Sequence, residues 1–178
     1  GGINQTSNQL DVAISGRGFF QVQLPDGSVG YTRDGSFKLN EQSQLVTSSG
    51  NIISPGITVP NSAQSVTIGS DGTVSALVAG ETTPQQLGTL QLTDFINPSG
   101  LQPRGENLYV ESAASGSPQT GTAGLSGLGT LEQGALEGSN VNVVEELVNM
   151  IETQRGYEMN SKAISASDQM MQYLNNNV

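Results

Sequence analysis

The side chains that most often do chemistry in enzymes are absent or scattered in this sequence. Its 178 residues contain no histidine and no cysteine. Their absence excludes Ser–His and Cys–His catalytic pairs, the usual Cys/His zinc sites and a disulfide framework within these residues. The 16 carboxylates leave a glycosidase-like acid pair open as an alternative. None of them lies in an aromatic-rich stretch that could hold a sugar, so we predict no catalytic, cofactor-binding or metal-binding residue and no cofactor.

Four short glycine motifs could be mistaken for ligand sites. Gly16-Arg17-Gly18 resembles part of a dinucleotide-binding loop, but it precedes a strand pattern and opens no helix. Asp26-Gly27, Asp34-Gly35 and Asp71-Gly72 suggest calcium loops, yet the sequence has no Asp-x-Asp spacing anywhere. We therefore interpret all four motifs as turns that connect strands.

The charge balance bears on the partners. Six Lys and Arg face 16 Asp and Glu, for a formal net charge of -10. Phosphate contacts need clustered Lys and Arg, so we predict no nucleic-acid partner and no polybasic membrane anchor. No apolar run approaches the roughly 20 residues of a membrane span, and no signal-peptide pattern opens the sequence. We therefore expect no direct membrane insertion and no cleaved signal peptide.

Residues from about 10 to 135 read as short strands joined by turns. Residues 20–24 alternate apolar and polar side chains, which is the period of a half-buried strand. Pro25-Asp26-Gly27 follows as a turn, and further short apolar runs recur at close spacing, with residues 86–95 as the longest strand candidate. This spacing predicts a small all-β domain of short antiparallel strands over residues 1–111. The small, polar residues that follow predict a linker and short β connector over 112–141.

The pattern changes after Asn142. Apolar residues recur at every seventh position from Val143 to Met171, with only Gly156 as a helix-breaking residue. That period predicts a long C-terminal α-helix over 142–176, about 50 Å long at 1.5 Å per residue. The predicted fold class is therefore mainly β, with this helix packing in trans.

This predicted helix has no second helix in the chain to cover its apolar seam. Long helices draw most of their stability from packing, so we expect the seam to contact other subunits, in the manner of an assembly protein. A helix that folds back on its own β-domain is the alternative. The predicted subunit-interface residues are Val143, Leu147, Met150, Ile151, Gln154, Tyr157, Ile164, Met171 and Leu174.

Five segments carry a family resemblance. They are GRGFFQV at 16–22, YTRDGSF at 31–37, LVTSSG at 45–50, QGALEGSNVN at 133–142, and the Glu-, Tyr- and Asn-containing stretch 145–162. Together they resemble the signatures of flagellar rod and hook proteins over nearly the whole chain. NLY at 107–109 and DQMM at 168–171 bring the resemblance nearest to subunits of the distal rod. The family's N-terminal helix is missing, so we expect a core fragment.

The resemblance implies a structural role and no enzymatic activity. Rod subunits of this family are exported without a cleaved signal peptide by the flagellar type III apparatus. They self-assemble into a hollow helical shaft across the periplasm that transmits torque from motor to hook. The implied partners are copies of the chain, other rod proteins, the hook protein, and the P and L ring proteins. Residues 1–111 would then form the outer domain of the subunit.

Three alternatives stay open at this point. A hook subunit or a proximal rod subunit would share the same architecture, although hook proteins carry larger outer β insertions. A carbohydrate-binding β-domain with an oligomerising helix, as in phage tail fibres, belongs to another class. Arg17, Arg33 and Arg104 are expected to be surface or salt-bridge residues, with contacts to neighbouring subunits as the alternative.

Overall fold

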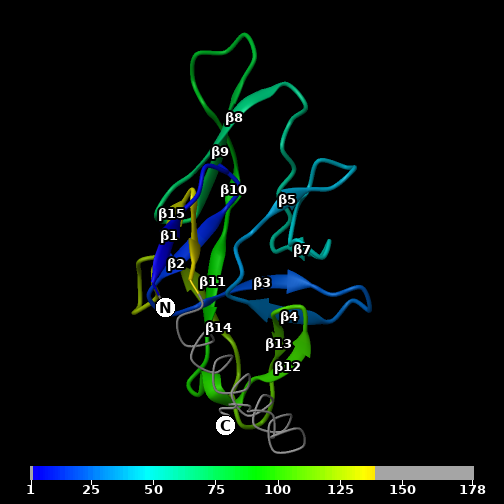
Figure 1. Cartoon of the computed structure of the whole chain (residues 1–178), viewed down its shortest axis with the longest axis vertical. Helices are drawn as coiled ribbons and strands as arrows, with labels where there is room; N and C mark the ends of the chain where they lie inside the picture. The colour runs from blue at the N-terminus through cyan, green and yellow to red at the C-terminus, as the bar shows by residue number, and fades with distance from the viewer. Residues whose placement is uncertain (1, 139–178) are drawn as a thin grey trace, which may run out of the picture. The chain divides into compact units, whose positions relative to one another are not determined.

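The computed structural model describes residues 2–138 (Figure 1). Within this part the chain is mainly β, with one short 3-10 turn, η1 (Pro98–Gly100), and no α-helix. The predicted fold class was therefore right about the strands and wrong to include a long α-helix. The helix expected over 142–176 lies outside the described residues. An apolar repeat without a packing partner in the same chain was too little evidence for it, because helices depend on such packing.

A three-stranded antiparallel sheet has β9 at its centre, in the order β10-β9-β8. Along β8 and β9, Val66, Ile68, Val74 and Ala76 are buried at alternate positions, as the period of a half-buried strand requires. The strands are β8 (Ala63–Ile68), β9 (Thr73–Val78) and β10 (Gln85–Thr89).

A nine-stranded sheet contains the strand predicted around residues 20–24 and, after the predicted turn, the strand that pairs with it. Its main path runs β12-β13-β4-β3-β7-β6-β5, and β11 joins it by pairing with both β3 and β14. Figure 1 shows β3 and β4 side by side, with β13 adjoining β4 and β12 adjoining β13. The strands are β3 (Phe19–Gln23), β4 (Val29–Thr32), β5 (Lys38–Leu39), β6 (Leu45–Val46), β7 (Ile52–Ile53), β11 (Gln91–Asp94), β12 (Gln102–Gly105), β13 (Leu108–Val110) and β14 (Gln119–Thr122).

The single long strand expected over residues 86–95 is divided between the two sheets. β10 ends at Thr89 and β11 begins at Gln91, and the buried Leu90 between them donates its N–H to the carbonyl of Gly72. A Cβ on Gly72 would lie 2.1 Å from the Leu90 carbonyl oxygen, so only glycine allows this approach. In the sequence, an apolar run that passes from one sheet to another cannot be distinguished from a single strand.

Two further sheets have two antiparallel strands each. β2 (Val12–Ser15) pairs with β15 (Thr130–Gln133), and β1 (Ile3–Gln5) pairs with β16 (Ala135–Glu137). β14, β15 and β16 all lie in the stretch 112–141. The domain boundaries at 111 and 141 stay predictions.

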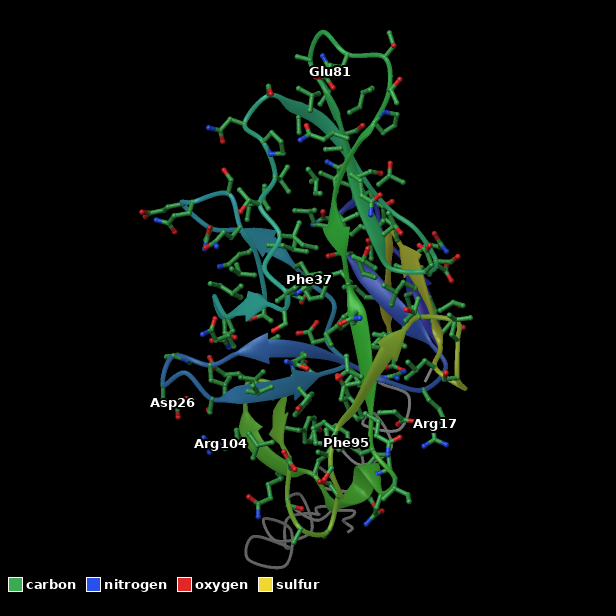
Figure 2. All side chains as sticks on the ribbon, turned by 180° about the vertical axis from the view of Figure 1, so that it is seen from behind. Arg17, Asp26, Phe37, Glu81, Phe95 and Arg104 are labelled. Carbon is green, nitrogen blue, oxygen red and sulfur yellow. The ribbon has the colours of Figure 1, made fainter. Side chains whose placement is uncertain are left out.

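Apolar side chains from several of these sheets form the main core. Phe20 is fully buried and meets Phe37 edge-on, with ring centroids 4.9 Å apart. Leu92 of β11 and Ile14 of β2 belong to the same cluster. A smaller cluster centres on Phe95, whose ring meets Tyr31 edge-on at 4.8 Å. Figure 2 labels Phe37 and Phe95, one in each cluster.

The three Asp-Gly motifs share one local geometry. The backbone N–H two residues later donates to the Asp side chain in each, from Ser28 to Asp26, from Ser36 to Asp34 and from Thr73 to Asp71, at 2.9–3.1 Å. These are Asx turns, in which the carboxylate accepts from its own loop. These hydrogen bonds support interpreting the motifs as turns. Among the described residues, no group of three or more His, Cys, Asp or Glu side chains could hold a metal ion.

Candidate assembly site

All nine predicted subunit-interface residues, from Val143 to Leu174, lie outside the described residues, and their role stays a prediction. The polar side chains of the Ile3–Glu137 unit show where its own chain segments are tied together. Among the described residues, no helix is long and apolar enough to cross a membrane.

Arg33 joins three segments that are far apart in sequence. Its Nη1 donates to the backbone carbonyls of Gly16 and Gly18 at 2.7 and 2.8 Å. Its Nη2 donates to the carbonyl of Ile14 at 3.2 Å and to Oε2 of Glu137 at 2.6 Å. Its Nε completes a two-pronged contact with Oε1 of Glu137 at 3.2 Å. The planar guanidinium is suited to this arrangement because its donors form a fixed fork.

A close backbone contact places Arg33 beside β2. Arg33 follows the last residue of β4, and two residues later Gly35 accepts a hydrogen bond from the Val12 N–H at 3.0 Å. A Cβ at Gly35 would lie 1.6 Å from the Val12 carbonyl oxygen. The motif segments 16–22, 31–37 and 133–142 thus converge on one arginine. This cluster could not be predicted from the sequence, because Arg33 and Glu137 are 104 positions apart and neither has a local signal.

The other two expected arginines also form ion pairs. Arg17 contacts Asp94 at 3.0 Å, and Arg104 reaches Asp26 at 4.0 Å, where Figure 2 labels the two near each other. Arg33 and Glu137 are more enclosed, with exposed side-chain fractions of 27% and 23%, against 48% and 63% for Arg104 and Asp26. Exposed pairs contribute little to stability, so the Arg33 pair is the strongest structural candidate of the three.

Two glutamine side chains cover the free edge of β8. Gln9 Oε1 accepts the Val66 N–H, and Gln133 Oε1 accepts the Ile68 N–H, both at 3.0 Å. Gln133 Nε2 donates to the carbonyls of Val66 and Gln9 at 2.8 and 2.6 Å. The amides take the place of a neighbouring strand, which satisfies an edge that would otherwise be open to pairing with another chain.

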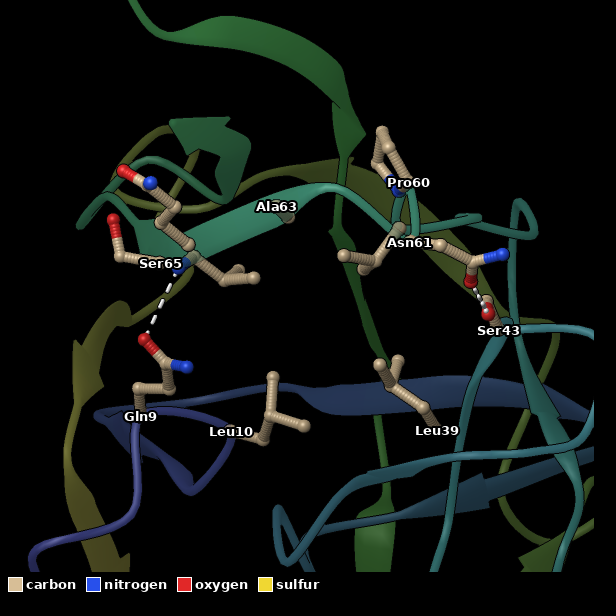
Figure 3. A pocket seen from close by; sticks show the side chains of 11 residues that line it. Gln9, Leu10, Leu39, Ser43, Pro60, Asn61, Ala63 and Ser65 are labelled. Atoms are coloured by element: carbon tan, nitrogen blue, oxygen red, sulfur yellow. Dashed lines mark hydrogen bonds between the residues drawn. The ribbon is translucent and has the colours of Figure 1, made fainter. Parts of the chain in front are cut away.

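A half-open groove of about 220 Å³ lies next to this edge (Figure 3). Leu10 and Leu39 face into it, and Ser43 donates to Asn61 at 2.9 Å on one side. The lining residues are uncharged and include neither a metal ligand nor an acid–base group. The groove therefore offers no chemistry of its own.

In the part of the chain that the structure describes, three side chains have shifted pKa values, and each lies in a turn or in the core. Hydrogen bonds from Ser28 lower the pKa of Asp26, and hydrogen bonds from Thr73 lower the pKa of Asp71. Burial, with a smaller contribution from Glu111, raises the pKa of the Tyr31 hydroxyl. Enzymes arrange such shifts within a shared cleft, whereas these three accompany turns or packing.

Comparisons with known proteins agree with this picture. Residues 13–76 match the family described as the flagellar hook protein FlgE/F/G D1 domain, and residues 132–177 match the flagellar basal body rod FlgEFG protein C-terminal family. A flagellar basal-body rod protein FlgG of Buchnera aphidicola from Acyrthosiphon pisum is 58% identical over 174 residues, which are 98% of this chain and 67% of that protein.

More distant relatives include both a rod protein and a hook protein. The FlgG rod protein of Caulobacter vibrioides is 45% identical over 94% of this chain and 64% of its own length. The flagellar hook protein FlgE of Escherichia coli is 43% identical over 66% of this chain, but only 29% of that protein is covered. The chain spans about two thirds of the length of the rod proteins that it matches. It belongs to the family of flagellar hook and basal-body rod proteins and is a structural component of the basal-body rod.

Proposed function

We propose that the chain is the part of a distal-rod subunit that builds the rod wall, and that copies of it assemble into a hollow helical shaft carrying torque from motor to hook. The identity of 58% over 98% of the chain to a basal-body rod protein carries this proposal. The described residues support a structural role, since their polar contacts join strands and turns. Other rod proteins, the hook protein, and the P and L ring proteins are the expected partners.

The contacts between copies are proposed to involve the apolar residues that recur from Val143 to Met171. The described unit already buries its own apolar side chains and leaves only Val29, Leu39, Ile96 and Leu125 as large exposed ones among residues 2–138. It therefore offers little apolar surface for assembly. A repeating apolar series elsewhere in the chain is a better source of the area that a stable assembly needs.

The test separates assembly from folding. Ile151→Asp places a charge in the proposed interface, where an unpaired buried charge destabilises the contact by about 3–5 kcal/mol. Because a helical assembly repeats each contact, we expect cells carrying this variant to lose motility while the melting temperature of the purified protein stays unchanged. Thr153→Asp, which adds the same charge at a position that is not among the predicted interface residues, is the matched control and should leave motility intact. Equal loss of motility in both variants, or a large fall in melting temperature for Ile151→Asp alone, would contradict the proposed interface.

A hook subunit is the second candidate, favoured by the identity of 43% to a hook protein over 117 residues. Genetic complementation separates the two. The intact gene should restore motility to a strain lacking its distal-rod gene and leave a strain lacking its hook gene immotile. The reverse pattern would assign the chain to the hook.

A further inference from the structure

The chain enters and leaves the Ile3–Glu137 unit through one pair of short strands. β1 and β16 are antiparallel, with Ile3 opposite Glu137, Asn4 opposite Leu136 and Gln5 opposite Ala135. Beyond this last pair, Gly138 donates its N–H to the carbonyl of Gly2. The incoming and outgoing chain segments therefore meet at the same end of the strand pair.

This geometry has a mechanical consequence. Pulling the two chain segments apart at that end stretches the ladder one rung at a time, beginning at Ile3 and Glu137, because antiparallel hydrogen bonds run across the strands. β1 adds little packing to resist this, since Ile3 is half-buried and Asn4 and Gln5 are exposed. Strand pairs of this kind open at low free energy unless another contact holds them.

The Arg33 contacts lie at that first rung. Glu137 is the last residue of β16, and both of its carboxylate oxygens accept from Arg33. Arg33 is in turn fixed by the carbonyls of Ile14, Gly16 and Gly18, which belong to β2 and to the loop before β3. The outgoing strand is thus tied to the segments that lead into the main core.

We propose that Arg33 and Glu137 form a clamp that fixes the point where the chain leaves the β-unit, so that force arriving through Gly138 passes to β2 and β4 and does not peel β16 from β1. In this role Arg33 is a positioning residue that acts through Glu137. The inference rests on the proposed function, because a clamp of this kind matters only in a subunit that carries load.

The clamp is tested first by hydrogen exchange on the purified chain. Arg33→Lys keeps the positive charge and loses the fork, and Glu137→Gln keeps the shape of the side chain and loses its charge. Because hydrogen bonds to charged groups are among the stronger ones, both variants should speed amide exchange of Ile3–Gln5 and Ala135–Glu137 by about ten- to a hundredfold. Exchange of Phe19–Gln23 in β3 should be unchanged. Arg104→Lys, at the exposed 4.0 Å pair with Asp26, is the matched control and should change neither.

The same substitutions in the protein as the bacterium makes it test the mechanical role. Cells carrying Arg33→Lys should build flagella in normal number and swim in dilute medium, but lose speed in viscous medium more steeply than wild-type or Arg104→Lys cells. Faster exchange in β3 as well would show that Arg33 holds the whole fold, which would overturn the clamp. Unchanged exchange in β1 and β16, or wild-type swimming under load, would overturn it too. Absence of the wild-type protein from isolated basal bodies would instead overturn the proposed function.

Discussion

The core around Phe20 and the junction around Arg33 hold the molecule together by different means. Phe20, Leu92 and Ile14 are at most 1% exposed and belong to one apolar cluster. At the junction, Arg33 and Glu137 keep about a quarter of their side chains exposed and make directional hydrogen bonds. Apolar burial sets how stable the unit is, because its contribution scales with area. The guanidinium of Arg33 instead fixes the relative position of the segments that it joins, because hydrogen bonds require a narrow range of distances and angles.

Substitutions in these two regions should therefore have different effects. Changes in the core should lower the melting temperature of the whole unit, whereas changes at the junction should act on the exit of the chain and leave the core intact. The contrast suits a structural subunit, which needs a body that stays folded and a fixed direction in which its chain continues.

Phe20→Ala should have the largest effect on stability. Phe20 is fully buried and meets Phe37 edge-on, so its truncation leaves a cavity that costs about 3–5 kcal/mol. Chemical denaturation of the purified protein measures this loss. Phe19→Ala on the same strand is the control, since Phe19 is only partly buried in the smaller cluster. An equal or larger loss for Phe19→Ala would show that the core is centred elsewhere.

Gly35→Ala should have the second-largest effect on stability. The added methyl group would lie 1.6 Å from the Val12 carbonyl oxygen, so the backbone between β4 and β2 has to move. Forcing extra atoms into a packed site costs about 1–3 kcal/mol. Gly27→Ala is the comparison for an added methyl group without a clash, because its Cβ would meet no atom within 4 Å. Its cost, about 1–2 kcal/mol, comes from the positive φ that Gly27 has and Gly35 lacks. Faster amide exchange at Val12 in the Gly35 variant, and not in the Gly27 variant, would locate the effect; the opposite pattern would contradict it.

Gln133→Ala should have an intermediate effect on stability, and the change in structure should be confined to the edge of β8. The variant removes the side chain that binds Ile68, Val66 and Gln9, and leaving such groups unpaired costs about 1–3 kcal/mol. The exposed edge of β8 should also promote pairing between copies, seen as concentration-dependent light scattering. Gln64→Ala, on the same strand with an exposed side chain, should leave scattering unchanged. Scattering that rises equally in both variants would rule out an edge-specific effect.

Asp71→Asn should have the smallest effect, visible only in acid. Hydrogen bonds from Thr73 hold the pKa of Asp71 below its ordinary value of 3.8. A group with a lowered folded-state pKa stabilises the protein above its unfolded-state pKa, and this contribution disappears as the pH falls through the folded-state value. Melting temperatures measured from pH 5 downward should therefore fall slightly less in the Asn variant than in wild type. A steeper fall in the variant would contradict the assigned direction.

The sequence alone predicted the local features of this fold better than the contacts between distant segments. Alternation in residues 20–24 and the Asp-Gly turns are short-range signals, and both appear in the structure. The division at Leu90 was missed because an apolar run shows no change of sheet. The Arg33 cluster was missed because Arg33 and Glu137 are ordinary polar residues until folding brings them together across a separation of 104 positions. The C-terminal α-helix of the predicted fold class rested on a periodic pattern alone, which cannot supply the packing partner that a helix needs. The described residues contain no α-helix, and the expected span 142–176 lies outside them.

Electron cryo-microscopy of isolated basal bodies tests the central claim most directly. If the chain builds the rod wall, the Ile3–Glu137 unit should fit the rod density as a repeat on a helical lattice. In every copy, Arg33 should contact Glu137, and the residues from Val143 to Met171 should contact neighbouring copies. Density for this unit in the hook alone, or no fit along the rod, would contradict the account.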